Sequence, residues 1–254
     1  MSEVLNPFEA HGIAHLSPSS CNLFTSAPAM FVLQKCLKRT TSVGPAAHRG
    51  TSVETGIVHG LMDPSASLGE CSEKAVDQFK TLTSMFGGPR TDKEIDAIPS
   101  MVKIGLAELR PYGIPSSTQG QIEHMVEGLA VPLMGFYDFE WEQSGILIDL
   151  KTTHALPSQI SQQHARQVAL YAAARGNNIS PRISYVTGKK CATYQLENVD
   201  EHVAALGRIA LTIQKFLSIS SDPMELASLV VPDTTSFYYS DPVSRQAAFE
   251  IWGI

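Results

Sequence analysis

Two aspartates and a lysine have a spacing that could hold a divalent metal ion. Asp138 lies in the aromatic-rich string GFYDFEW at 135–141, and Asp149 and Lys151 lie in the string GILIDLK at 145–151. Alternate residues of a strand share a face, so Asp149 and Lys151 would point the same way. Carboxylate oxygens suit Mg²⁺ or Mn²⁺, and a nearby lysine could orient water or stabilise charge on a phosphate. A plain ion pair between Asp149 and Lys151 is the alternative.

The register of a predicted hairpin brings the second acid to this pair. If residues 142–145 form the loop, or Gln143 and Ser144 within it, Asp138 falls directly opposite Asp149. Directly opposed residues have Cβ atoms about 5 Å apart, and two carboxylates at that distance repel each other. A divalent cation would compensate this repulsion, so the pattern predicts a metal site on the hairpin.

The elements that must position this hairpin alternate in type along the chain. An apolar period of two predicts strands at 119–127, 131–141 and 145–152, and then at 182–187 and 191–196. Helical periodicity and capping residues predict helices at 17–37 (bent or divided at Pro28), 46–62, 67–86, 92–109, 157–175, 199–217 and 242–252. This order predicts an α/β fold with a mixed central sheet flanked by helices.

Length and composition favour one large domain over 1–254, with a helical insertion at about 63–110 and C-terminal helices at about 198–254. The chain has 254 residues, of which 43% are hydrophobic and 17% charged, enough to bury a core. We find no apolar run long enough to span a bilayer and no basic signal region at the start. We therefore expect a soluble, cytoplasmic protein, located in a bacterial host if it is phage-encoded.

The net charge of −6 counts against a protein that coats nucleic acid, although a local basic groove remains compatible with it. A solvated surface face is the alternative for each candidate basic group. The candidates are Lys35, Lys38, Arg39, Arg49, Lys189 and Lys190.

The four cysteines lie far apart without a C-x-x-C pair, which indicates buried thiols rather than a zinc ribbon or a disulfide framework.

Together these strings resemble a known family. The series G-x-x-D at 135–138, D-x-K-T at 149–152 and Q-x-x-x-Y at 167–171 resembles the RecB-like nucleases of the PD-(D/E)XK superfamily. Upstream, LSPSS at 16–20 resembles their opening serine motif, and RGTSVE at 49–54 resembles their G-x-x-x-H or G-x-x-x-E helix. The resemblance covers roughly 15–190, and a glutamate on that helix is similar to the lambda-exonuclease branch. The resemblance to this superfamily implies a restriction-endonuclease-like core.

Site roles follow from the resemblance, position by position. It implies that Glu54, Asp138, Asp149 and the Leu150 carbonyl bind the metal and that Lys151 is the catalytic lysine. His59, in a second G-x-x-H string, is the alternative helix ligand.

The helix after the hairpin and several outer residues complete the implied site. Gln167 and Tyr171 are i, i+4 neighbours that would support the metal or the phosphate. The residues expected to contact DNA are Ser17, Ser19, Arg49, Lys189 and Lys190. Since only Cys191 follows the core, we expect no iron–sulfur cluster.

The expected activity is that of a Mg²⁺-dependent (or Mn²⁺-dependent) DNA exonuclease in recombination, repair or phage replication. The chain has no G-x-x-x-x-G-K-[ST] helicase motif. Similar phage exonucleases degrade one strand of duplex DNA, form homo-oligomeric rings and work with a single-strand annealing protein. The alternatives are an endonuclease or CRISPR-adaptation nuclease, a catalytically silent DNA-binding or assembly module, and a metal-binding hydrolase with another substrate.

Overall fold

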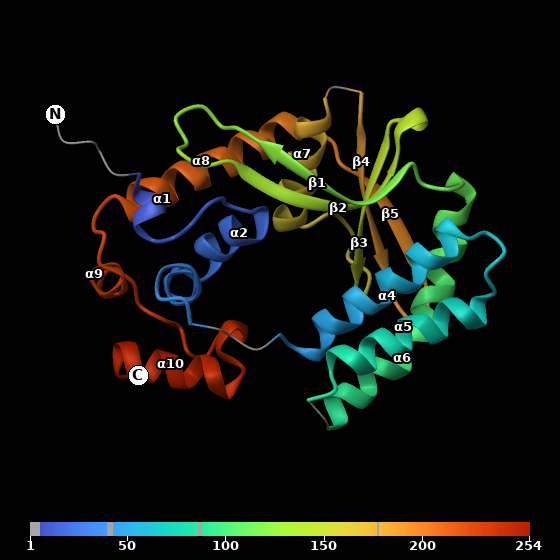
Figure 1. Ribbon diagram of the computed structural model, residues 1–254, viewed down its shortest axis with the longest axis horizontal. Coiled ribbons are helices and arrows are strands. Elements are labelled where there is room, and N and C mark those ends of the chain that lie inside the picture. The colour runs from blue at the N-terminus through green and yellow to red at the C-terminus, as the bar shows by residue number, and fades with distance from the viewer. Residues whose placement is uncertain (1–5, 40–42, 86–87, 177) are drawn as a thin grey trace. The chain divides into compact units, whose positions relative to one another are not determined.

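The computed structural model describes residues 6–39, 43–85, 88–176 and 178–254 (Figure 1). Residues 40–42, Phe86, Gly87 and Asn177 lie outside the described residues, so the end of the helix predicted at 67–86 lies outside them as well. The chain divides into two compact units. The first unit comprises Met1–Ser42, Ile122–Gly135 and Val199–Ile254, and the second comprises Val43–Gln121 and Phe136–Asn198. The expectation of one domain over 1–254 stays a prediction.

The sheet has five strands in the order β1-β2-β3-β4-β5. Their bounds are β1 Ser117–His124, β2 Leu133–Trp141, β3 Ile146–Thr152, β4 Ser180–Val186 and β5 Cys191–Gln195. β3 pairs antiparallel with β2 and parallel with β4, and β4 pairs antiparallel with β5. The sheet is therefore mixed, which confirms the predicted α/β fold.

The hairpin between β2 and β3 has the register that the sequence predicted. Phe139 pairs with Ile148, and the pairing continues through Glu140 with Leu147 to Trp141 with Ile146. A 3-10 turn, η3 (Glu142–Ser144), and Gly145 at a φ of 60° close the loop. Continuing this register by one residue from Phe139 sets Asp138 against Asp149.

The helices of the second unit cover both faces of its sheet. Their bounds are α4 Pro45–Met62, α5 Leu68–Leu82, α6 Pro89–Leu109, the 3-10 helix η2 Arg110–Tyr112 and α7 Gln162–Arg175. Ile57 of α4 and Val102 of α6 share a core with Ile148 and Leu150 of β3. Because residues alternate along β3, Asp149 points to the opposite face, where α7 packs on β3 and β4.

The predicted start of α7 was wrong by five residues. The sequence placed the helix from Pro157, whereas it begins at Gln162. Ser161 caps it, because its hydroxyl accepts a hydrogen bond from the His164 backbone N–H at 3.2 Å. Residues 157–160 instead run along the surface between β3 and α7.

The inserted helices pack closely on α4. A Cβ atom at Gly56 of α4 would lie 2.6 Å from the Cys71 carbonyl oxygen of α5, and one at Gly60 would lie 2.7 Å from the Cys71 Sγ. Only glycine permits this approach. The helices at 68–109 therefore hold α4 and the residues that it carries.

The first unit is largely helical. Its helices are α1 Pro7–Ala10, α2 Pro18–Ser26, α3 Pro28–Phe31, the π-helix η1 Val32–Cys36, α8 Val199–Leu217, α9 Pro223–Ser228, the 3-10 helix η4 Phe237–Tyr239 and α10 Pro242–Trp252. Pro28 divides the predicted helix at 17–37, and α9 lies in a segment that the sequence assigned to a connection. Phe24 packs against Phe31 and Phe216 with ring centroids 5.2 and 5.5 Å apart. Among the described residues, no helix has the length and apolarity needed to cross a bilayer.

Candidate active site

The second unit brings the carboxylates and the lysine of the hairpin together. Asp149 is 1% exposed, and its Oδ2 atom lies 2.7 Å from Nζ of Lys151. Asp138 is half-buried, and its Oδ2 atom accepts a hydrogen bond from the Leu150 backbone N–H at 2.6 Å. The Leu150 backbone thus contacts the cluster through its N–H group, while a role for its carbonyl stays a prediction.

Helix α7 contributes an amide and a phenol to the same cluster. Gln167 Nε2 donates to Asp149 Oδ1 at 3.2 Å and to the Tyr171 hydroxyl at 2.6 Å. The i, i+4 spacing places both side chains on one face of α7, as the sequence predicted. Tyr171 is buried, so it fixes Gln167, and Gln167 in turn orients the Asp149 carboxylate.

Helix α4 contributes Glu54. Burial and the charge on Asp149 raise the pKa of Glu54 and outweigh the hydrogen bond from Gln119. Its Oε1 atom accepts that hydrogen bond from Gln119 Nε2 at 2.9 Å. His59 lies further along α4, near Asp63 and Glu70. The structure therefore brings Glu54, the preferred helix ligand, to the aspartates.

Sequence reasoning missed Gln119. It lies on β1 with a φ of 52°, a left-handed conformation that is uncommon for a residue other than glycine. Strained backbone of this kind is often held at functional sites. The sequence offered no signal for it, because the partner Glu54 is 65 positions away.

The cluster carries opposed charges that shift its pKa values. Burial and then the charges of Asp149 and Glu54 raise the pKa of Asp138 well above its ordinary value. Burial alone would lower the pKa of Lys151, but Asp149 and Asp138 outweigh it and raise that pKa. The carboxylates of the cluster therefore favour the charged form of Lys151, which suits it to stabilising anions.

The donor set fits a hard divalent cation in kind. Asp149 is buried with Lys151 as its ion-pair partner, and the charges of Asp149 and Glu54 both act on Asp138. One lysine does not balance three clustered carboxylates, and a divalent metal ion would offset their repulsion. Within the part of the chain that the structure describes, no three acidic, histidine or cysteine side chains are gathered tightly enough to form a finished metal site.

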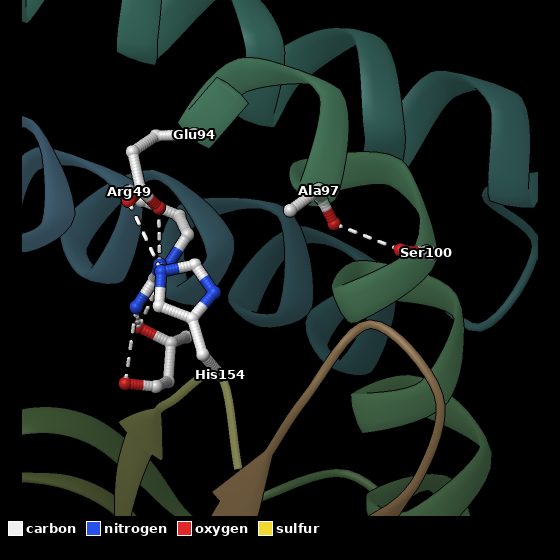
Figure 2. A network of polar contacts seen from close by, with 6 residues as sticks. Arg49, Glu94, Ala97, Ser100 and His154 are labelled. Carbon is white, nitrogen blue, oxygen red and sulfur yellow. Dashed lines mark hydrogen bonds and ion pairs between the residues drawn. The ribbon is translucent and has the colours of Figure 1, made fainter. Parts of the chain in front are cut away.

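Arg49, a predicted DNA contact, is buried in a polar network beside the cluster (Figure 2). It is 3% exposed and forms an ion pair with Glu94 of α6. It also donates to the Thr152 carbonyl at 3.2 Å and lies 3.1 Å from His154 Nε2. With these partners its guanidinium joins α4 and α6 to the end of β3, and in this structure it does not face solvent.

The other predicted DNA contacts differ in setting. Lys189 and Lys190 are exposed in the turn between β4 and β5, where their backbone N–H groups bond the Thr187 hydroxyl. Ser17 belongs to the first unit and caps α2, where its hydroxyl accepts a hydrogen bond from the Ser20 N–H and lies 2.9 Å from that of Ser19. Their binding of DNA stays a prediction.

A second acid of β2 has partners that the sequence did not reveal. Glu140 is 2% exposed and accepts hydrogen bonds from Arg175 Nε at 2.8 Å and Nη2 at 2.9 Å. The hydroxyl groups of Tyr137 and Ser117 donate to the same carboxylate at 2.7 and 3.1 Å. The ion pair of Glu140 with Arg175 links the end of α7 to β2.

A sequence model of the PD-(D/E)XK nuclease superfamily matches residues 15–225. The chain belongs to this superfamily. Its mixed five-stranded sheet with flanking helices is the restriction-endonuclease-like α/β fold of PD-(D/E)XK nucleases. Such proteins are nucleases and generally depend on divalent metal ions. The match is to the whole superfamily, so the RecB-like or lambda-exonuclease branch stays a prediction.

No curated protein matches this PD-(D/E)XK chain. Chains of solved structures do match it, including one titled "Crystal structure of SSO0001". That chain is 16% identical, with a TM-score of 0.36, and the alignment covers 84% of this chain and 100% of that one.

Proposed function

We propose that this protein is a Mg²⁺-dependent or Mn²⁺-dependent DNA exonuclease that hydrolyses phosphodiester bonds at the Asp138, Asp149 and Lys151 cluster. The observation that carries the proposal is the buried Asp149, whose Oδ2 atom lies 2.7 Å from Lys151 and whose strand register sets it against Asp138. A structural ion pair at a surface would need neither this burial nor a second aspartate across the hairpin.

Each residue has a distinct role in the proposal. Asp138, Asp149 and Glu54 hold the metal, with the Leu150 carbonyl as a further ligand. A divalent ion held by these residues would supply a Lewis acid for the phosphate and lower the pKa of water. Lys151, which lies 2.7 Å from Asp149, would stabilise the negative charge that develops on the phosphate.

The proposal of DNA as substrate, and of attack from an end, rests on the motif series. The G-x-x-D, D-x-K-T and Q-x-x-x-Y strings resemble RecB-like and lambda-type exonucleases, which favours double-stranded DNA and a role in recombination, repair or phage replication. A ring of copies and a single-strand annealing partner belong to the same proposal. A ring with a basic bore would reconcile DNA binding with the net charge of −6.

The test compares linear and circular duplex DNA with Mg²⁺, with Mn²⁺ or with EDTA. We expect linear DNA to lose terminal nucleotides, covalently closed circles to stay intact, and EDTA to stop the reaction. Degradation of the circle would identify an endonuclease instead. The absence of cleavage of any DNA would favour a silent binding module. Sedimentation tests the ring, and a monomer at working concentration would contradict it.

Matched variants test the site itself. We expect Asp149→Asn and Lys151→Ala each to lower cleavage by at least about 100-fold, the scale of losing one stabilising group at a charged transition state. The controls Asp96→Asn and Lys103→Ala change the same residue types at exposed positions of α6 and should keep full activity. Cleavage at the wild-type rate by Asp149→Asn would reject the assignment.

A further inference from the structure

A cavity opens beside Lys151 on the side away from Asp138, in the segment that joins β3 to α7. Its volume is about 460 Å³, and Lys151, Thr153 and Ser161 contribute to its wall. This volume lies within the range of about 300 to 1,000 Å³ that is usual for ligand sites. A molecule in this cavity would therefore lie against the same ammonium group that the catalytic cluster uses.

One side of the cavity is aromatic and held in place. The His164 ring packs on Tyr185 with centroids 5.6 Å apart, and His164 Nδ1 lies 2.8 Å from the Tyr185 hydroxyl. Tyr185 is 3% exposed and contacts Tyr194 edge-on with centroids 6.0 Å apart. The imidazole is thus held in place by Tyr185 in the wall of the cavity.

The remaining lining is divided between apolar and polar groups. Ala155 and Pro157 supply apolar surface, whereas Thr153, Ser161 and Lys151 supply hydroxyl groups and a positive charge. A flat aromatic base could stack on the imidazole beside the apolar groups, and a sugar or phosphate could meet the hydroxyl and ammonium groups. Stacking of a base on an aromatic side chain stabilises binding and tolerates any base.

We propose that this cavity binds the nucleotide that adjoins the scissile phosphate. The proposal rests on the proposed function, because Lys151 contacts both the cavity and the site of cleavage. The subsite would place the strand so that its phosphate lies against Lys151 and Asp149. It would act on any sequence, because stacking does not distinguish the bases strongly.

The test fills the cavity without altering the cluster. Ala155 is exposed at its edge, so Ala155→Trp should block the cavity without disturbing the core. Ser158→Trp is the matched control, since Ser158 is exposed in the same segment but lies outside the lining. His164→Ala removes the imidazole from the wall instead, and circular dichroism checks that each variant is folded.

Two measurements read the result. By NMR titration, we expect dAMP to bind wild type and Ser158→Trp alike and to bind Ala155→Trp and His164→Ala at least about 10-fold more weakly. In cleavage of a short oligonucleotide, we expect Ala155→Trp to raise KM about 10-fold with a smaller change in kcat. Equal dAMP affinity in wild type and Ala155→Trp, or no dAMP binding to wild type, would overturn the subsite.

The two proposals can fail separately. If wild type cleaves DNA and Ala155→Trp has the wild-type KM and dAMP affinity, the subsite is wrong and the nuclease assignment stands. If wild type cleaves no nucleic acid, the nuclease assignment is wrong, and the dAMP titration still decides whether the cavity binds a nucleotide.

Discussion

Asp138 and Glu140 lie two residues apart on β2, yet their surroundings shift the pKa values of the two acids in opposite directions. Glu140 accepts hydrogen bonds from Arg175, Tyr137 and Ser117. Burial alone would raise the pKa of Glu140, but the hydrogen bonds from Arg175 and Tyr137 outweigh burial and lower it. Burial and two neighbouring carboxylates instead raise the pKa of Asp138. The ionised form of Glu140 therefore stabilises the fold, whereas that of Asp138 destabilises it.

This difference separates a structural acid from a functional one. A buried carboxylate with complete partners has no need of a ligand. A carboxylate held close to other carboxylates destabilises the fold by charge repulsion, and binding of a cation would offset that repulsion. The contrast therefore supports the proposed metal site without reference to any relative.

The largest expected effect that tests this contrast is on catalysis. Asp138→Asn should lower DNA cleavage by at least about 100-fold, because it removes a metal ligand. It should also raise the free energy of unfolding by about 1 kcal/mol in metal-free buffer, since it removes repulsion with Asp149 and Glu54. Cleavage assays and urea denaturation measure the two effects. An active Asp138→Asn variant would contradict the contrast.

Glu140→Gln should have the opposite profile. We expect it to lower the free energy of unfolding by about 1–3 kcal/mol, because it leaves Arg175 without its charged partner. Cleavage by the folded variant should stay within a few-fold of wild type. The control Glu142→Gln changes an exposed acid of the adjoining turn and should unfold at the wild-type urea midpoint. A Glu140→Gln variant that is fully stable but inactive would move Glu140 into the catalytic machinery.

Arg49→Lys tests a second buried ion pair, and the expected effect on stability is smaller than that of Glu140→Gln. Lysine keeps the charge beside Glu94 but loses the fork that also reaches Thr152, so we expect a loss of about 1 kcal/mol in unfolding free energy. If Arg49 is a positioning residue, kcat should fall a few-fold while the KM for DNA stays unchanged. A raised KM with unchanged kcat would return Arg49 to the predicted DNA contacts.

The smallest expected effect is a pH dependence of stability. The pKa of Glu140 is lower in the folded protein than its ordinary value of 4.5. The stability that the ionised Glu140 contributes is therefore fully present above about pH 4.5. It is lost as the pH falls through the lowered pKa of Glu140 in the folded protein. The stability difference between wild type and Glu140→Gln, measured by urea denaturation, should narrow only below that pH. A difference that narrows at higher pH would show that the ion pair is not its cause.

Local signals explain what the sequence could predict. Helices α8 and α10 have the predicted bounds within the described residues, because apolar periodicity marks α8 and a Pro at the first turn marks α10. The hairpin register follows from a short loop, which fixes every later pair. These features depend on residues that are close together in the chain.

The missed features depend on distant partners. Arg175 meets Glu140 across 35 positions, and Arg49 meets Glu94 across 45, so neither pair has a local pattern. Without Glu94 and Thr152 in view, Arg49 resembled an exposed basic residue. The predicted start of α7 at Pro157 overlooked the cap at Ser161, because proline and serine are both common at helix starts and these preferences alone do not fix the boundary.

The way that the chain divides between its two units bears on the order of events during synthesis. Every residue proposed for catalysis lies in the second unit, which ends at Asn198, whereas the first unit also needs Val199–Ile254. Because translation proceeds from the N-terminus, we expect the hairpin, α4 and α7 to emerge from the ribosome before α8 does. The catalytic residues can therefore come together before the last helices of the first unit have been synthesised.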